Sequence, residues 1–134
     1  MSTALHPCRP ISIGVHCPAE AVYAFARVPE NFPKWAAGLG AGLIRDGETW
    51  IAHGPDGDVR VRFSPANTFG VLDHWVTLTD GTEISIPLRV VANGDGAEVT
   101  LTLFRVPGMD DATFERDAGM VAKDLATLKA LLEA

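Results

Sequence analysis

The segment DDATFERDAGMVAKDLATLKALLEA, residues 110–134, has the most regular pattern in the chain. Its apolar residues are spaced alternately four and three positions apart, which is the spacing of one face of a helix. Asp110 is placed to cap the first turn, and Met109 and Phe114 are placed for a hydrophobic staple. The pattern predicts an amphipathic helix over 110–133, about 35 Å long from the helical rise per residue. The residues of its apolar face are Phe114, Ala118, Val121, Leu125, Leu128 and Leu132.

Residues 40–106 show no helical pattern, and turn signals interrupt them about every ten residues. The turns are predicted at 46–47, 54–57, 80–81 and 93–96, where a glycine follows Asp or Asn. Strands joined by such short turns must pair in antiparallel fashion, because parallel neighbours need a long crossover. The predicted strands cover residues 42–45, 49–53, 58–64, 70–78, 83–92 and 97–106.

The N-terminal third predicts one strand and two short helices. Apolar residues alternate with small or polar ones over 11–15, which is the period of a half-buried strand. Pro18 suits the first position of a helix over 19–28, and the prolines that follow leave room only for a second short helical piece over 30–39. The whole chain, 1–134, is therefore expected to form one α+β domain. In this domain a seven-stranded antiparallel sheet wraps round the C-terminal helix, and two short helices separate the first two strands.

Composition narrows the class of protein. The 134 residues are 47% hydrophobic and 21% charged, which is typical of a globular domain. The net charge of −6 argues against nucleic acid as a partner, because phosphate backbones attract basic surfaces. No apolar run approaches the ~20 residues of a membrane span, and His6, Pro7 and Pro10 stand where a signal peptide would be apolar. A cytoplasmic location is expected.

Neither a metal nor a cofactor is expected. The two cysteines, Cys8 and Cys17, are too few for a disulfide framework and lack the spacing of metal ligands. The four histidines lack metal spacing as well. The glycines at 38–42 do not complete a nucleotide-binding motif.

Several motifs resemble a known family. They are ISI at 11–13, CPAEAVYAF at 17–25 with Trp35 about ten residues on, and RVVANG at 89–94. Together with the order of elements they are similar to the small bacterial members of the SRPBCC superfamily, which includes START-like proteins, polyketide cyclases and birch-pollen allergens. The resemblance implies a helix-grip fold, in which members bind lipids, steroids, hormones or polyketides and some catalyse cyclisation or dehydration. This superfamily has no shared catalytic motif, so the site residues must come from the sequence itself.

Alternate residues of the strand over 70–78 point to opposite faces, and the length of the loop that follows decides which set faces the cavity. A three-residue loop at 79–81 points Leu72, His74, Val76 and Leu78 inward, whereas a two-residue turn points Val71, Asp73, Trp75 and Thr77 inward. The first register is favoured, because its inward set is more apolar. In either register Asp73 or His74 faces an apolar wall, where its pKa is perturbed and where it can orient a ligand or transfer a proton.

The other strands contribute mainly apolar candidates. Ile86 and Leu88 share the concave face with Leu101, and Arg89 points outward as a solvated or surface-paired side chain. Trp50 and His53 lie on opposite faces of one strand, so only one of them faces inward, and the pattern does not say which. Asp117 and Asp124 flank the apolar face of the C-terminal helix, at the rim of any cavity.

The expected function is the binding of a small hydrophobic or aromatic molecule between the sheet and the C-terminal helix. The alternative is a polyketide cyclase or dehydratase-like enzyme that uses His74 or Asp73 for proton transfer. An interaction domain with a filled core is a third reading, and the oligomeric state is open, with a homodimer among the choices. The predicted ligand-binding residues are Phe25, Trp35, Trp50, His74, Trp75, Ile86, Leu88, Leu101, Val121 and Leu125.

Overall fold

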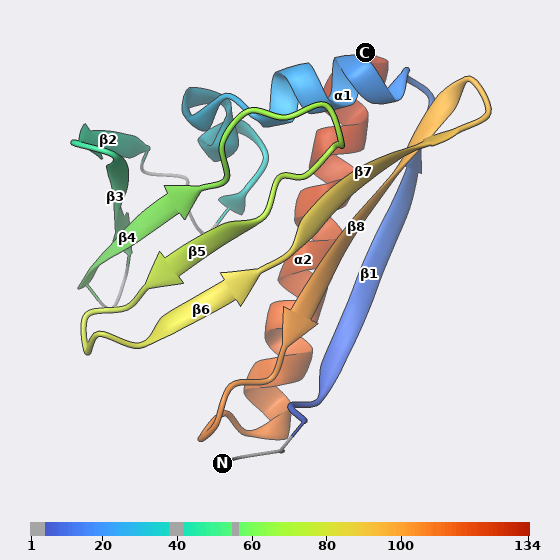
Figure 1. Ribbon diagram of the computed structural model, residues 1–134. Coiled ribbons are helices and arrows are strands. Elements are labelled where there is room, and N and C mark those ends of the chain that lie inside the picture. The colour runs from blue at the N-terminus through green and yellow to red at the C-terminus, as the bar shows by residue number, and fades with distance from the viewer. Residues whose placement is uncertain (1–4, 38–41, 55–56) are drawn as a thin grey trace.

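The computed structural model describes residues 5–37, 42–54 and 57–134, and its elements follow the predicted order (Figure 1). A strand and two short helices come first, then a series of strands, then one long helix. The elements are β1 (Cys8–Val15), α1 (Ala19–Ala26), η1 (Pro29–Lys34), β2 (Leu43–Asp46), β3 (Thr49–Gly54), β4 (Gly57–Phe63), β5 (His74–Thr77), β6 (Glu83–Ile86), β7 (Leu88–Asn93), β8 (Gly96–Phe104) and α2 (Asp111–Glu133). The predicted α+β architecture is confirmed.

The strands form two antiparallel sheets rather than the single seven-stranded sheet that was predicted. One sheet has the order β1-β8-β7 and the other β2-β3-β4-β5-β6. The division falls at Pro87, which separates β6 from β7 within the predicted strand over 83–92. Proline has no N–H to donate to a neighbouring strand, so the ladder is interrupted there. The sheets stay connected, because the Leu72 amide donates to the Leu88 carbonyl at 2.8 Å and the Val90 amide to the Gly70 carbonyl at 2.9 Å.

The helix α2 runs along the three-stranded sheet, with the five-stranded sheet projecting to one side (Figure 1). Asp110 caps it as predicted, since its side chain accepts a hydrogen bond from the Thr113 amide at 2.8 Å. Leu125 and Leu128 on its inner face are fully buried, as are Leu88 and Val99 on the sheet that they face. Burying a leucine stabilises a fold by about 1.5–3 kcal/mol, so this contact is a major source of stability.

The two short helices differ slightly from their predicted extents. The first ends at Ala26, two residues before the predicted end. The second is a 3-10 helix, Pro29–Lys34, because Pro33 inside it cannot continue an α-helical hydrogen-bond pattern. The predicted residues 38–39 of this helix, and residues 55–56 of the predicted turn between β3 and β4, lie outside the described residues. No helix within the described ranges is long and apolar enough to cross a membrane.

The loop between β5 and β6 has the predicted three-residue form. The Leu78 amide donates to the Thr82 carbonyl at 2.8 Å, which leaves residues 79–81 in the loop. Gly81 has a positive φ of 89°, a conformation that glycine adopts without steric cost. The favoured register of the preceding strand is therefore correct, and Leu72 and His74 are buried.

Gly70 allows the segment before β5 to lie directly against β7. Its φ is +72°, and a Cβ atom placed there would collide with the carbonyl oxygen of Val90. Gly94, in the turn between β7 and β8, also has a positive φ, but a Cβ atom there would meet nothing within 4 Å. An alanine at Gly94 would therefore cost only backbone strain, whereas an alanine at Gly70 would cost backbone strain and a steric clash with β7.

We expect Gly70→Ala to destabilise the protein more than Gly94→Ala does. The Gly94 variant should lose about 1–2 kcal/mol, which is the cost of a left-handed residue with a Cβ atom. The Gly70 variant should lose at least about 3 kcal/mol, because β7 must also move away. Chemical denaturation of both variants measures the difference, and equal losses would contradict the close approach of Gly70 to Val90.

Candidate functional site

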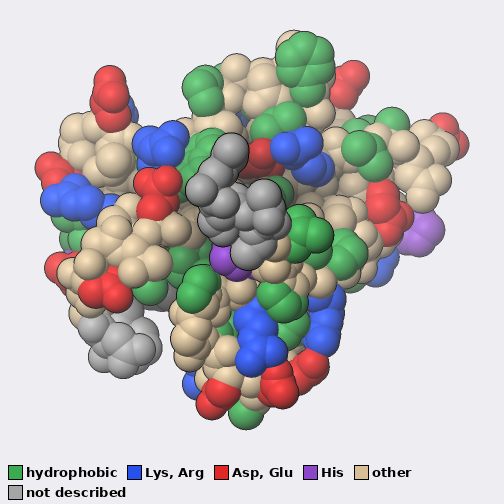
Figure 2. Space-filling model, turned by 60° about the horizontal axis from the view of Figure 1, so that its bottom comes forward, with side chains coloured by type: hydrophobic (Ala, Val, Ile, Leu, Met, Phe, Trp, Pro, Cys, Tyr) green, Lys and Arg blue, Asp and Glu red, His purple; other side chains and the backbone are tan. Residues whose placement is uncertain are grey.

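A cavity of about 290 Å³ lies between α2 and the concave face of the sheets. Six of the predicted ligand-binding residues line it: Trp35, His74, Ile86, Leu101, Val121 and Leu125. Its other lining residues are Phe32, Ala36, Val59, Val76, Leu103 and Asp124. The wall is mainly apolar. On the face of the molecule shown in Figure 2, several hydrophobic side chains and a histidine lie near the middle of the view.

Four predicted residues do not line this cavity. Leu88 is fully buried in the core, and Phe25 on α1 packs against that core. Trp50 pairs with Val61, so it lies on the concave face, which answers the question left open between Trp50 and His53. It is nevertheless absent from the cavity wall.

Trp75 lies on the outer face of the sheet. It pairs there with Arg62 on β4, whose guanidinium carbon lies 4.2 Å from the centre of the indole ring. Because strand neighbours point to opposite faces, the inward position of His74 excludes an inward position for Trp75. The register that supported Trp75 as a ligand-binding residue is therefore wrong.

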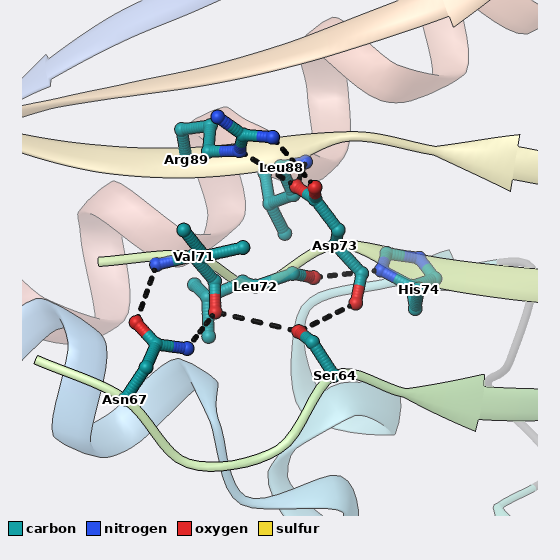
Figure 3. Close-up of polar contacts among 8 residues, drawn as sticks. All are labelled: Ser64, Asn67, Val71, Leu72, Asp73, His74, Leu88 and Arg89. Atoms are coloured by element: carbon teal, nitrogen blue, oxygen red, sulfur yellow. Dashed lines mark hydrogen bonds and ion pairs between the residues drawn. The ribbon is translucent and has the colours of Figure 1, made fainter. Parts of the chain in front are cut away.

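His74 is the buried titratable residue of the cavity wall, with 6% of its surface exposed. Its Nδ1 lies 3.1 Å from the Leu72 carbonyl oxygen (Figure 3). A carbonyl oxygen only accepts hydrogen bonds, so Nδ1 carries the proton in the neutral ring. Burial lowers the pKa of His74 below its usual value, because the charged form loses its hydration. The ring is therefore neutral at neutral pH.

An aromatic cluster surrounds His74. The Phe32 ring lies 5.4 Å from the His74 ring and 4.9 Å from the Trp35 ring, measured between centroids. Phe63 on β4 completes the cluster, with its centroid 4.9 Å from that of Phe32. Trp35 is 4% exposed, and no residue in the described part of the chain accepts a hydrogen bond from its Nε1. The cavity wall thus combines aromatic surface with one buried, unpaired N–H donor.

Asp124 brings a carboxyl group to the cavity from α2. Its Oδ1 accepts a hydrogen bond from the Ala37 amide at 3.1 Å, which ties α2 to the segment after η1. Partial burial raises the pKa of Asp124 above its usual value, and the Ala37 hydrogen bond opposes this effect. Asp124 was placed at the cavity rim from its helical position, and it lines the wall.

Asp73 points away from the cavity, toward β7 (Figure 3). Its carboxylate accepts hydrogen bonds from the Leu88 amide at 2.9 Å and from Arg89 at 2.9 and 2.7 Å. Hydrogen bonding by Arg89 holds the pKa of Asp73 below its usual value. Arg89 therefore points outward and pairs with a carboxylate at the surface, as its position in the strand predicted.

The segment between β4 and β5 is held by its own polar side chains. Ser64 Oγ donates to the Asp73 carbonyl at 2.7 Å (Figure 3). The Asn67 side chain donates to the Val71 carbonyl at 2.9 Å and accepts from the Val71 amide at 3.1 Å. These bonds fix the backbone just before His74, and with it the direction of the imidazole.

A larger hollow of about 650 Å³ lies between α1, the segment 66–70 and β7. Its walls include Phe69, which is 81% exposed, and Val91, which is 54% exposed. It shares no described lining residue with the first cavity. We favour the smaller cavity as the functional site, because its lining residues are buried or partly buried and include the buried polar groups of His74 and Trp35.

Sequence reasoning did not single out Phe32 and Val59 as cavity residues. Phe32 stands three residues before Trp35, and one 3-10 turn separates them, so this spacing could have indicated a shared face. Val59 belongs to the alternating pattern of β4, but the face of that strand depends on its pairing with β5. In the described part of the chain, no three side chains of His, Cys, Asp or Glu form a metal-binding group.

Comparison with known proteins gives a match in structure and none in sequence. No protein-family model matches the chain, and no curated protein does. A START superfamily protein from Mycobacterium smegmatis matches with a TM-score of 0.69 at 14% identity, over 94% of this chain and 97% of that chain. Ara h 8.0201 matches with a TM-score of 0.69 at 11% identity, over the same shares of the two chains. The chain has the helix-grip fold.

A third helix-grip match is the Aha1 dimer from Colwellia psychrerythraea. Its TM-score is 0.74 at 16% identity, and the match covers 95% of this chain and 96% of that one. The resemblance to the START-like proteins that the sequence motifs indicated is thus confirmed at the level of the fold.

The buried neutral state of His74 predicts a pH dependence of stability. In the unfolded chain His74 gains a proton below about pH 6.5, whereas the buried ring gains it only at lower pH. Lowering the pH from 7 to 5 therefore favours the unfolded state, by at most about 1.4 kcal/mol per pH unit from this residue. Denaturation curves should show a steeper loss for the wild type than for His74→Phe. Parallel losses in the two proteins would contradict the burial of a neutral His74.

Proposed function

We propose that this protein binds a small hydrophobic or aromatic molecule in the cavity between α2 and the sheets. The observation that carries the proposal is an apolar hollow of about 290 Å³ with His74 and Trp35 buried in its wall. Ligand sites are typically apolar clefts with a few well-placed polar groups, which is the composition of this wall. The similarity to a START superfamily protein supports the same kind of function.

The volume supports a ligand of modest size. A dry apolar cavity of about 150 Å³ holds benzene, so about twice that volume suits two fused rings. The rings of Phe32 and Trp35 offer aromatic surface for such a ligand. A steroid or a long lipid would fill the cavity and extend beyond it.

An enzyme of the cyclase or dehydratase type is the second candidate. His74 and Asp124 both line the cavity, and both have pKa values displaced by burial, which is common among acid–base groups of active sites. Asp73 no longer supports this candidate, because its carboxylate is paired with Arg89 on the outer face. Binding is preferred, because a histidine whose pKa is lowered is a weaker base at neutral pH.

Partners other than the ligand remain predictions. The Aha1 structure that matches this chain is a dimer, which favours testing for a homodimer here as well. A homodimer in which β1 of one copy pairs with a strand of the other is disfavoured. Pro10 lacks the N–H that such pairing needs, and Lys129 Nζ already donates to the Gly14 carbonyl at 3.0 Å.

We expect Val121→Trp to weaken ligand binding strongly, because Val121 lines the cavity from α2 and an indole there would occupy it. Titration calorimetry with naphthalene should show at least a tenfold loss of affinity. Val91→Trp is the matched control, since it makes the same change in the other hollow. Equal affinity of the two variants, or a loss only in the Val91 variant, would contradict the proposal. Mass spectrometry of the denatured wild-type protein should also identify a co-purified apolar molecule.

A further inference from the structure

The cavity offers a hydrogen-bond acceptor that the protein does not use. His74 Nδ1 donates to the Leu72 carbonyl, so the neutral ring leaves Nε2 with a lone pair. No residue in the described ranges donates a hydrogen bond to Nε2. His74 lines the cavity, and Trp35 Nε1, not His74 Nε2, is the fully buried unpaired atom among the described residues, so Nε2 is open to a ligand that donates a hydrogen bond.

The cavity wall also contains a donor without an acceptor. Trp35 Nε1 is buried, and no described residue accepts from it. Trp35 and His74 both pack against the ring of Phe32. One acceptor and one donor thus lie on the same aromatic part of the wall. A ligand oxygen with a hydrogen can satisfy groups of both kinds, whereas a methyl group satisfies neither.

The charges of the wall disfavour anions. Asp124 and His74 are the titratable residues that line the described cavity, and no lysine or arginine is among the described lining residues. One oxygen of Asp124 already accepts the Ala37 amide. A carboxylate or sulfonate in the cavity would lose hydration, would meet no cation and would face the Asp124 carboxyl group.

We propose that the cavity selects a neutral aromatic molecule with a hydroxyl group, which donates its hydrogen to His74 Nε2. This inference rests on the proposed function and adds the chemical class of the ligand. Apolar contacts with the aromatic wall supply affinity, and the hydroxyl group sets the orientation of the rings. The unpaired N–H of Trp35 favours an oxygen in the same part of the cavity.

Three ligands of the same ring system test the proposal by titration calorimetry on the full chain. They are 2-naphthol, 2-methylnaphthalene, which has a methyl group in place of the hydroxyl, and 2-naphthoate, which is anionic. The wild type should bind 2-naphthol at least fivefold more tightly than 2-methylnaphthalene and at least tenfold more tightly than 2-naphthoate. Without a hydrogen bond the order of the first two should be reversed, because the methyl group is more hydrophobic.

His74→Phe should produce that reversal, since the phenyl ring cannot accept the hydroxyl hydrogen. His53→Phe is the matched control, because His53 lies on the outer face beside Asp58, and it should keep the wild-type order. Wild-type protein that binds 2-methylnaphthalene or 2-naphthoate as tightly as 2-naphthol would overturn this inference and leave the proposed function intact. Failure of all three ligands, and of naphthalene, would overturn both.

A measurement on the wild type makes the test independent of how well the variants fold. In protein labelled with ¹⁵N at histidine, 2-naphthol should shift the Nε2 resonance of His74, because a nitrogen that accepts a hydrogen bond changes its shielding. Saturation with 2-methylnaphthalene should leave the resonance close to its position in the free protein. The same shift with both ligands would overturn the role of the hydroxyl group.

Discussion

Asp73 connects the two sheets and fixes the side chains on either side of it. Its carboxylate accepts hydrogen bonds from Leu88 and Arg89 of β7, while the strand that follows it belongs to the five-stranded sheet. The side chain is only 16% exposed, so water competes weakly for these bonds. Since neighbouring strand residues point to opposite faces, the outward carboxylate requires His74 to point inward. The chemistry of the cavity thus depends on a pair of groups outside it.

Nearby interactions support the same arrangement of residues 70–74. Gly70 brings the chain against β7, where no residue with a Cβ atom fits without movement. Ser64 and Asn67 hold the backbone between β4 and β5. The three-residue loop between β5 and β6 fixes, from the other end of β5, which of its side chains point inward. These constraints agree with one another, which is typical of a segment with a single stable conformation.

The cavity joins an apolar wall with few polar groups, and each of these groups is placed by a different element. His74 comes from β5, Trp35 follows η1, and Asp124 lies on α2. A single strand or helix therefore does not carry a recognisable motif for the site.

The sequence alone determined the order of elements and the cap and apolar face of α2, and it favoured the correct inward set of the strand before β6. These features follow from spacing and turn chemistry, which act over a few residues. The tertiary structure decided the break at Pro87, the outward position of Trp75 and the presence of Phe32 and Val59 in the cavity wall. Such features depend on which strands pair and how a short helix packs across them, and these contacts join residues far apart in the chain. The hydrogen bond to Leu72 that leaves His74 Nε2 available, and the burial of Trp35 Nε1 without an acceptor in the described residues, likewise exist only in the folded protein.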